Sequence, residues 1–164
     1  MAGFETENKP AGKTVEQSRT VQVHILRNQY LNGYGQLFGG QLMMWIDEVA
    51  GIVSRRHCNG VVTTASVDKL DFSEPAYIND LIVMEGKVTY VGRTSMEIRV
   101  DSYVESGGMR KPINRAYVVM VAIDENRKPV QVPRLELVTQ EEKDEWAMGE
   151  KRYALRARRK KEGY

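Results

Sequence analysis

The residues best suited to chemistry lie between positions 32 and 47. Gly39 and Gly40 directly precede a stretch with helical spacing, so this region presents unpaired N–H groups at the positive end of a helix dipole. Such a position suits an anion or a developing oxyanion. Asp47 follows about two turns later among small and apolar neighbours, a setting that raises a carboxyl pKa toward that of a useful general base. Asn32, on the preceding glycine-rich loop, can orient a carbonyl group or a water molecule.

Each of these residues also has a purely structural explanation, because glycine and asparagine favour turns and a helical aspartate usually faces solvent. Other catalytic motifs are absent from the sequence, which has no G-x-S-x-G, P-loop or H-E-x-x-H. Its two histidines, His24 and His57, fit a strand and a helix end, and we interpret them as structural. The single cysteine, Cys58, makes neither an intramolecular disulfide nor a cysteine-rich zinc site, and we predict no metal site.

The elements that must position these residues follow from the spacing of apolar side chains. Residues 41–58 repeat apolar side chains at intervals of three and four, which predicts a long core helix. Its other side, around Met43, Met44, Asp47 and Gly51, carries only one charge. A helix that is apolar on two sides is usually buried on both, here by its own sheet and by a second layer or subunit.

The rest of the chain reads mainly as strands. Residues 20–26 alternate as a half-buried strand does, with an apolar face (Val21, Val23, Ile25) and a polar one. Further strands are predicted at 61–72, 81–91, about 96–105 and 115–125, of which the third has the clearest apolar and charged faces. A terminal helix opens with Thr139 and Glu142 as a capping box. Strands and helices do not alternate, so the fold class is α+β.

Size and charge limit the alternatives. A chain of 164 residues with 28% charged residues is typical of one globular domain. We expect a disordered arm at 1–18, the main domain at 19–138, and a charged helix and tail at 139–164. The net charge of +2 divides into −4 for residues 1–150 and +6 for residues 151–164. The basic end is explained equally well by a solvated helix end and by a phosphate-bearing partner.

The stretch N-G-Y-G-Q-L-F-G-G-Q-L-M-M-W-I-D-E-V-A-G, residues 32–51, resembles the signature of hotdog-fold acyl-CoA thioesterases of the cytosolic, brain acyl-CoA hydrolase type. The resemblance continues through VVTTASVDKLDF, GRTSMEIRVDSYVE, VPRLELVTQEEK and RYALRARRKK, from about residue 17 to residue 161. It implies an antiparallel sheet of about five or six strands wrapped around the long helix, plus a C-terminal helix. It also implies a homodimer with its sheets paired edge to edge, and further assembly as a trimer of dimers, a homohexamer.

The resemblance also implies a site and a reaction. In such enzymes the site lies at the dimer interface, with the loop Asn from one subunit and the helix Asp from the other, positions that Asn32 and Asp47 match. We expect the amides near Gly40 to hold the thioester oxygen while Asp47 activates water, as a base or as a nucleophile. Arg93, Thr94 and Ser95 match a turn that lies near the coenzyme A nucleotide in similar proteins.

The expected activity is therefore hydrolysis of fatty acyl-CoA without a cofactor, in the cytoplasm, with neither nucleic acid nor membrane as a partner. Weaker candidates for contacts to coenzyme A are five basic residues of the tail, Lys151, Arg152, Arg156, Arg158 and Arg159. The alternatives are a non-catalytic hotdog protein that senses acyl-CoA, a DNA-binding regulator, and a hydratase or dehydratase. The last usually requires a catalytic histidine near the central helix. The length of the acyl chain and any regulation by nucleotides stay open.

Overall fold

A computed structural model describes residues 10–164, and two helices and a curled sheet dominate it. The elements in chain order are β1 (Lys13–Thr14), α1 (Val15–Ser18), β2 (Thr20–Ile25), the 3-10 turn η1 (Asn28–Tyr30), α2 (Gly39–Cys58), β3 (Val61–Asp68), β4 (Leu81–Val91), β5 (Ser95–Ser106), β6 (Met109–Ile123), β7 (Leu135–Glu136) and α3 (Gln140–Glu162). The α+β hotdog prediction is confirmed, with five strands in the main sheet.

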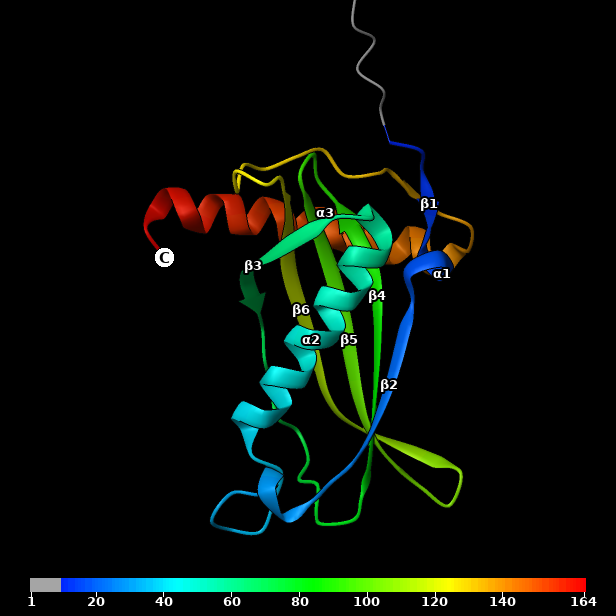
Figure 1. Cartoon of the computed structure of the whole chain (residues 1–164), viewed down its shortest axis with the longest axis vertical. Helices are drawn as coiled ribbons and strands as arrows, with labels where there is room; N and C mark the ends of the chain where they lie inside the picture. Colours follow the sequence, from blue (N-terminus) through cyan, green and yellow to red (C-terminus); the bar gives the residue numbers. More distant parts are fainter. Residues whose placement is uncertain (1–9) are drawn as a thin grey trace, which may run out of the picture.

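The main sheet is antiparallel throughout and runs in the order β2-β4-β5-β6-β3. Helix α2 crosses one of its faces and α3 lies across the other (Figure 1). A parallel pair, β1 with β7, lies outside this sheet. Strand β3 ends at Asp68, earlier than the predicted residue 72, and the chain then continues without regular structure toward β4.

Helix α2 packs against the sheet with the predicted apolar stripe. Its buried residues include Leu42, Ile46, Val49 and Val53. The approach to β4 is very close at Gly86, where a methyl group would lie 2.6 Å from Cγ1 of Val49 and 2.9 Å from Cγ2 of Val53. Since α2 already fills this space, only glycine fits there without displacing the helix.

The other side of α2 faces outward in the single chain. Met43 and Met44 are 46% and 50% exposed, and Asp47, about one turn further along this side of the helix, is also exposed. The prediction of burial on two sides is therefore met on the sheet side only. The outer side is open to a second layer.

Strand β2 is half-buried, as predicted, but its inward face is the polar one. The ring of His24 stacks on Trp45 of α2 with centroids 4.2 Å apart, and Gln22 is also partly covered. The apolar face is turned outward, with Val23 at 55% exposure. Alternation alone therefore predicted the strand but not which side met the helix.

Helix α3 is held to the outer face of the sheet by ion pairs. Glu97 of β5 is 1% exposed and accepts from Arg152 and Arg156 of α3, each at 2.8 Å. Arg99 of β5 donates to Glu145 of α3 at 2.6 Å. The predicted two faces of β5 are thus correct, and its charged face is covered by α3.

Ordered structure begins earlier than the sequence predicts. Lys13–Thr14 form β1 and Val15–Ser18 form α1, with Val15 and Ser18 buried. The prediction that the folded part starts near Arg19 is therefore wrong for residues 13–18, because two short elements pack there. The rest of the expected arm, residues 1–9, lies outside the described residues.

In the described chain, residues 10–164, neither long helix has the continuous apolar surface needed to cross a lipid bilayer.

His57 closes the far end of α2 and makes stability depend on pH. Its side chain is fully buried, and Nε2–H donates to the carbonyl oxygen of Pro133 at 3.0 Å. Burial lowers the pKa of His57 below its ordinary 6.5, against the opposing effect of that hydrogen bond. The folded chain therefore disfavours the imidazolium, which the unfolded chain accepts freely.

We expect the free energy of unfolding to be unaffected by His57 well above pH 6.5 and to fall as the pH drops below that value, because protons then bind preferentially to the unfolded chain. Urea unfolding of wild type and His57→Gln, from about pH 8 to about pH 5 at fixed protein concentration, measures this effect. The variant should lose less stability on acidification. Parallel curves would contradict the assignment.

Candidate functional site

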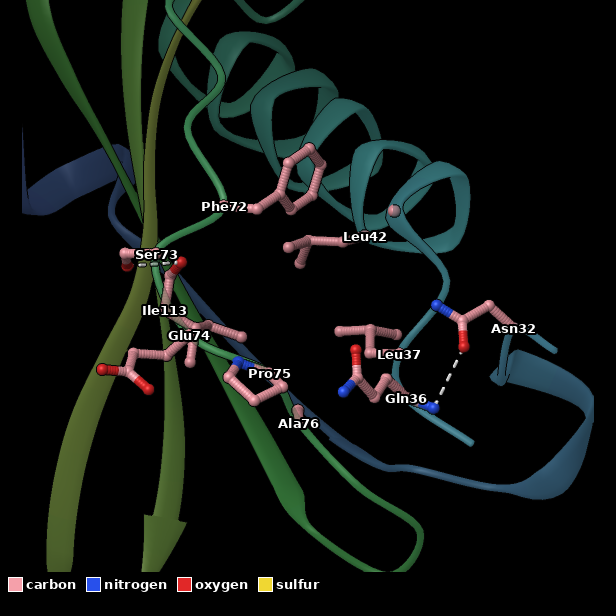
Figure 2. A pocket seen from close by; sticks show the side chains of 11 residues that line it. Asn32, Gln36, Leu37, Leu42, Phe72, Ser73, Glu74, Pro75, Ala76 and Ile113 are labelled. Carbon is pink, nitrogen blue, oxygen red and sulfur yellow. Dashed lines mark hydrogen bonds between the residues drawn. The ribbon is translucent and has the colours of Figure 1, made fainter. Parts of the chain in front are cut away.

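Asn32 is held by its own loop in one orientation. Its Oδ1 accepts from the backbone N–H groups of Tyr34, at 2.9 Å, and Gln36, at 3.2 Å. Both partners are donors, so the oxygen of the amide must face them and Nδ2 must face away. Figure 2 shows the Nδ2 atom turned toward the start of α2. The side chain thus presents two N–H donors to the space beside the helix.

Backbone hydrogen bonds hold the loop that carries Asn32 on both sides. The N–H of Leu37 donates to the carbonyl of Ala76 at 2.8 Å, and that of Phe38 to the carbonyl of Tyr30 at 2.8 Å. The backbone of Gln36 also forms an isolated antiparallel β-bridge with Tyr77. These bonds join the glycine-rich loop to the segment that precedes β4, and they fix where α2 begins.

Helix α2 begins without a side-chain cap. Phe38 is the N-cap, and the first helical donors, Gln41 and Leu42, reach its carbonyl at 3.0 and 3.1 Å. Within residues 10–164, the N–H groups of Gly39 and Gly40 have no backbone acceptor. A methyl group at Gly40 would lie 2.6 Å from the ring of Phe38, so a side chain there would collide with the cap. The start of α2 therefore has the unpaired N–H groups that the sequence predicts.

A cavity of about 460 Å³ lies beside Asn32, between the start of α2 and the segment before β4 (Figure 2). We call it the Asn32 pocket. Its lining residues are Asn32, Gln36, Leu37, Gly39, Leu42, Phe72, Ser73, Glu74, Pro75, Ala76 and Ile113. Asn32 and the helix N-terminus thus face a common space.

Asp47 faces a different cavity, of about 360 Å³, on the outer side of α2. Thr64 of β3 donates to Oδ1 of Asp47 at 2.6 Å and lines the same cavity, as does Gly40. The other lining residues are mostly apolar, as predicted, but Asp47 is exposed in the single chain because the outer face of α2 has no cover within the described chain. The bond from Thr64 fixes one carboxylate oxygen, and within residues 10–164 no hydrogen bond reaches the other, Oδ2.

Thr64 is a site residue that the spacing of the helix and loop did not predict. It comes from a strand, and its hydroxyl meets Asp47 only after α2 has packed on the sheet. The stretch VVTTASVDKLDF, part of the resemblance described above, was the one signal that contained it.

The chain does not bring Asn32 and Asp47 together. Asn32 and Gly39 line one cavity, while Gly40, Asp47 and Thr64 line the other. The two adjacent glycines thus lie between the two cavities. Within one chain, Asn32 and Asp47 do not line a common cavity.

Arg93 and Thr94 lie in the turn between β4 and β5, and Ser95 is the first residue of β5. This turn is at the opposite end of the sheet from the start of α2 (Figure 1). Its backbone is rigid, since Val132 donates to the Arg93 carbonyl and Ala122 to the Thr94 carbonyl, both at 3.0 Å. Arg93 is exposed, and no ion pair in the described part of the chain involves it. Its guanidinium is thus available to an anion.

Much of the basic tail is engaged inside the chain. Arg152 and Arg156 pair with the buried Glu97, and Arg156 and Arg159 reach Asp68 at 3.1 and 3.4 Å. The guanidinium of Arg152 also stacks over the ring of Tyr117, with Cζ 3.8 Å from the ring centre, and this contact holds the same side chain. Three of the five tail candidates for coenzyme A therefore have an internal role.

Across residues 10–164, His, Cys, Asp and Glu side chains do not gather in any group of three that could hold a metal ion.

Comparison with known proteins gives consistent matches. The model of the thioesterase superfamily matches residues 34–110. An uncharacterized acyl-CoA thioester hydrolase of Bacillus subtilis, YkhA, is 37% identical over 135 residues, 81% of this chain and 78% of the relative. The cytosolic acyl coenzyme A thioester hydrolase of Rattus norvegicus is 33% identical over 94% of this chain, which spans only 42% of the rat protein.

Solved structures agree. An apo-hexameric acyl-CoA thioesterase superposes with a TM-score of 0.87 and 37% identity, over 92% of this chain and 97% of the other. An acyl-CoA hydrolase of Staphylococcus aureus, solved with butyryl coenzyme A and coenzyme A, superposes with a TM-score of 0.87 and 29% identity. The match covers 92% of this chain and 93% of the other. Alanine variants of that hydrolase replace an asparagine, an aspartate 15 positions later and a threonine 17 positions after that.

The two hydrogen bonds that Asn32 Oδ1 accepts predict that this side chain slows hydrogen exchange in its loop. Asn32→Ala removes the acceptor for the N–H groups of Tyr34 and Gln36, so their amide hydrogens should exchange about fivefold faster, the effect of losing one ordinary hydrogen bond. Asn32→Asp keeps an acceptor oxygen there and is the matched control. Hydrogen exchange followed by NMR measures both, and unchanged rates in Asn32→Ala would show that Oδ1 does not hold the loop.

Proposed function

The chain belongs to the thioesterase superfamily, among the hotdog acyl-CoA hydrolases, and from that membership we propose that it hydrolyses fatty acyl-CoA to the free acid and coenzyme A. One observation supports this most strongly. Asn32, Asp47 and Thr64 are separated by 15 and 17 positions, the same intervals that separate the three residues replaced in the Staphylococcus aureus hydrolase. In this chain the last two are joined by a 2.6 Å hydrogen bond.

In the proposed reaction the thioester oxygen lies against the start of α2. The free N–H groups at Gly39 and Gly40 and the Nδ2 donors of Asn32 stabilise the negative charge that forms on that oxygen. Removing one such donor typically lowers a rate by about 10² to 10³. Because Oδ1 is already occupied, Asn32 acts only as a donor, and in this proposal its acceptor is the carbonyl oxygen.

Asp47 supplies the base. Its Oδ2 takes a proton from a water molecule, whose oxygen attacks the carbonyl carbon. As the carbon–sulfur bond breaks, the proton returns from Asp47 to the sulfur of coenzyme A. Thr64 holds Oδ1 so that Oδ2 stays directed at the water. A thioester is activated enough for this arrangement to need no cofactor.

The proposed enzyme works as an oligomer. Asn32 and Asp47 face different cavities of one chain, so each complete site takes Asn32 and the helix start from one protomer and Asp47 with Thr64 from another. The exposed outer face of α2 offers the contact, and a dimer then has two equivalent sites. Several solved relatives are hexameric, and we propose a trimer of such dimers.

Two further parts of the proposal concern substrate binding and location. Arg93, Thr94 and Ser95 form a rigid turn with an unpaired cation, which suits the phosphates of coenzyme A. The rat, mouse and human relatives are named cytosolic, and we propose a cytoplasmic location for this chain.

Asp47→Ala tests the reaction. We expect kcat for acyl-CoA to fall by about 10² to 10⁴, the usual contribution of a general base, while the oligomer measured by light scattering persists. Glu48→Ala, which removes the neighbouring exposed carboxylate of α2, is the control and should keep its activity.

The readout is release of free thiol from acyl-CoA. An Asp47→Ala protein that keeps its oligomeric state and its rate of thiol release would contradict the proposed mechanism. A wild-type protein that binds acyl-CoA and releases no thiol would instead favour the sensing alternative.

Arg93→Ala tests the binding turn. Losing one charge-assisted contact to phosphate should raise KM for acyl-CoA about tenfold and leave kcat nearly unchanged. Lys143→Ala removes an exposed cation of α3 that is not a candidate for contacts to coenzyme A, and this control should keep its KM. An unchanged KM in steady-state assays would remove Arg93 from the site.

A further inference from the structure

Asp68, the last residue of β3, forms ion pairs that the proposed chemistry does not use. Nη1 of Arg156 in α3 lies 3.1 Å from Oδ2 of Asp68, and Nη1 of Arg159 lies 3.4 Å from Oδ1. The side chains of Asp68 and Arg156 are 22% and 17% exposed, so solvent screens their attraction less than that of an ordinary surface pair. The basic end of α3 is thus bound to the end of the strand that carries Thr64.

Arg156 also joins Asp68 to a buried group of the sheet. The same Nη1 atom lies 2.8 Å from Oε2 of Glu97 in β5, whose side chain is 1% exposed. Glu97 is held separately by Arg152, at 2.8 Å, and by the hydroxyl of Thr89, at 2.7 Å. One guanidinium nitrogen therefore bridges a carboxylate fixed beneath α3 and a carboxylate at the edge of the sheet.

The backbone of α3 is fixed before it reaches Arg156. Gly149 is buried against β4, where a methyl group would lie 2.7 Å from Cβ of Tyr90. One turn later Arg152 pairs with Glu97. Since α3 is packed this closely on the outer face of the sheet (Figure 1), contacts with β4 and β5 set the position of Arg156. Arg156 can therefore fix the position of Asp68, rather than the reverse.

Strand β3 has little else to hold it at this end. It lies at the edge of the main sheet, with β6 as its only strand neighbour in the described part of the chain, and six of its eight residues are exposed. Its register with β6 shifts between Thr64 and Ser66. Because such a shift disrupts the ladder, the direction of Thr64 depends on how both flanks are held. The earlier flank follows α2 after a short turn, and the later one ends at Asp68.

We propose that Arg156 is a positioning residue for the reaction, because it fixes the end of β3 through Asp68. The strand then keeps the hydroxyl of Thr64 2.6 Å from Oδ1 of Asp47, the proposed base. This inference rests on the proposed thioesterase function. It also separates Arg156 from the earlier candidates for contacts to coenzyme A, since its Nη1 atom is occupied by two carboxylates of its own chain.

Steady-state kinetics of thiol release from acyl-CoA test the inference with Arg156→Ala. We expect kcat to fall about tenfold with little change in KM, because a base that is displaced by less than about 1 Å loses part of a roughly 100-fold effect while the contacts to substrate remain. Glu97 keeps Arg152 and Thr89 as partners, so the variant should fold. Arg156→Lys places one ammonium near both carboxylates and should recover most of the lost rate.

Two further variants match this one. Asp68→Asn removes the charge that Arg156 binds, and kcat should fall as it does in Arg156→Ala. Arg110→Ala is the control and should keep both kcat and KM. Arg110 is an arginine of the same sheet, but its ion-pair partners are Glu85 of β4 and Glu105 of β5 rather than a residue of β3.

Thr64→Ala removes the hydroxyl that Arg156 is proposed to position. In that background, Arg156→Ala should lower kcat by less than about twofold further, because coupled residues do not contribute additively. A tenfold loss in both backgrounds would show that Arg156 acts independently of Thr64 and would overturn the inference. A raised KM with unchanged kcat would also overturn it and would assign Arg156 to coenzyme A.

Amide hydrogen exchange in the assembled protein separates this inference from the proposed function. The amides of residues 66–68, which pair with β6, should exchange about fivefold faster in Arg156→Ala and Asp68→Asn and at the wild-type rate in Arg110→Ala. Unchanged exchange in a wild-type enzyme that releases thiol would overturn the inference alone. If wild type released no thiol, the proposed function and the positioning role of Arg156 would both be overturned.

Discussion

The close approach of α2 to β4 is the contact on which the rest of the structure depends. It is possible because position 86 is glycine, which lets Val49 and Val53 reach the sheet. The groups that α2 itself contributes to the candidate site are placed by that contact. The helix start faces the loop of Asn32, its outer side carries Asp47 toward Thr64, and Leu42 lines the Asn32 pocket. A helix held farther from the sheet would separate Asp47 from the threonine that orients it.

Local patterns carried most of the information about the elements. The apolar spacing of α2, the alternation of β5 and the capping box of α3 each depend on neighbours a few residues apart, and all three are present in the structure. Asn32 and Asp47 were recognisable because each belongs to a distinctive loop or helix. These predictions needed only short-range geometry and a recognisable sequence motif.

What the sequence did not reveal depends on distant contacts. The inward face of β2 is decided by the stacking of His24 on Trp45, and nothing in the strand itself indicates that partner. Thr64 gains its candidate role from Asp47, 17 positions earlier, and Phe72 lies in the loop after β3, a segment that was predicted as strand. The excess charge of the tail was visible, but its pairing with the buried Glu97 was not, because a charge count carries no positions.

The separation of Asn32 and Asp47 into different cavities has a genetic consequence under the proposed assembly. Two chains, one defective at Asn32 and the other at Asp47, each form inactive dimers alone. When they pair with each other, one of the two sites receives both defects and the other receives none. Two loss-of-function alleles of this kind would therefore complement each other, and a carrier of both would retain part of the activity that neither supplies by itself.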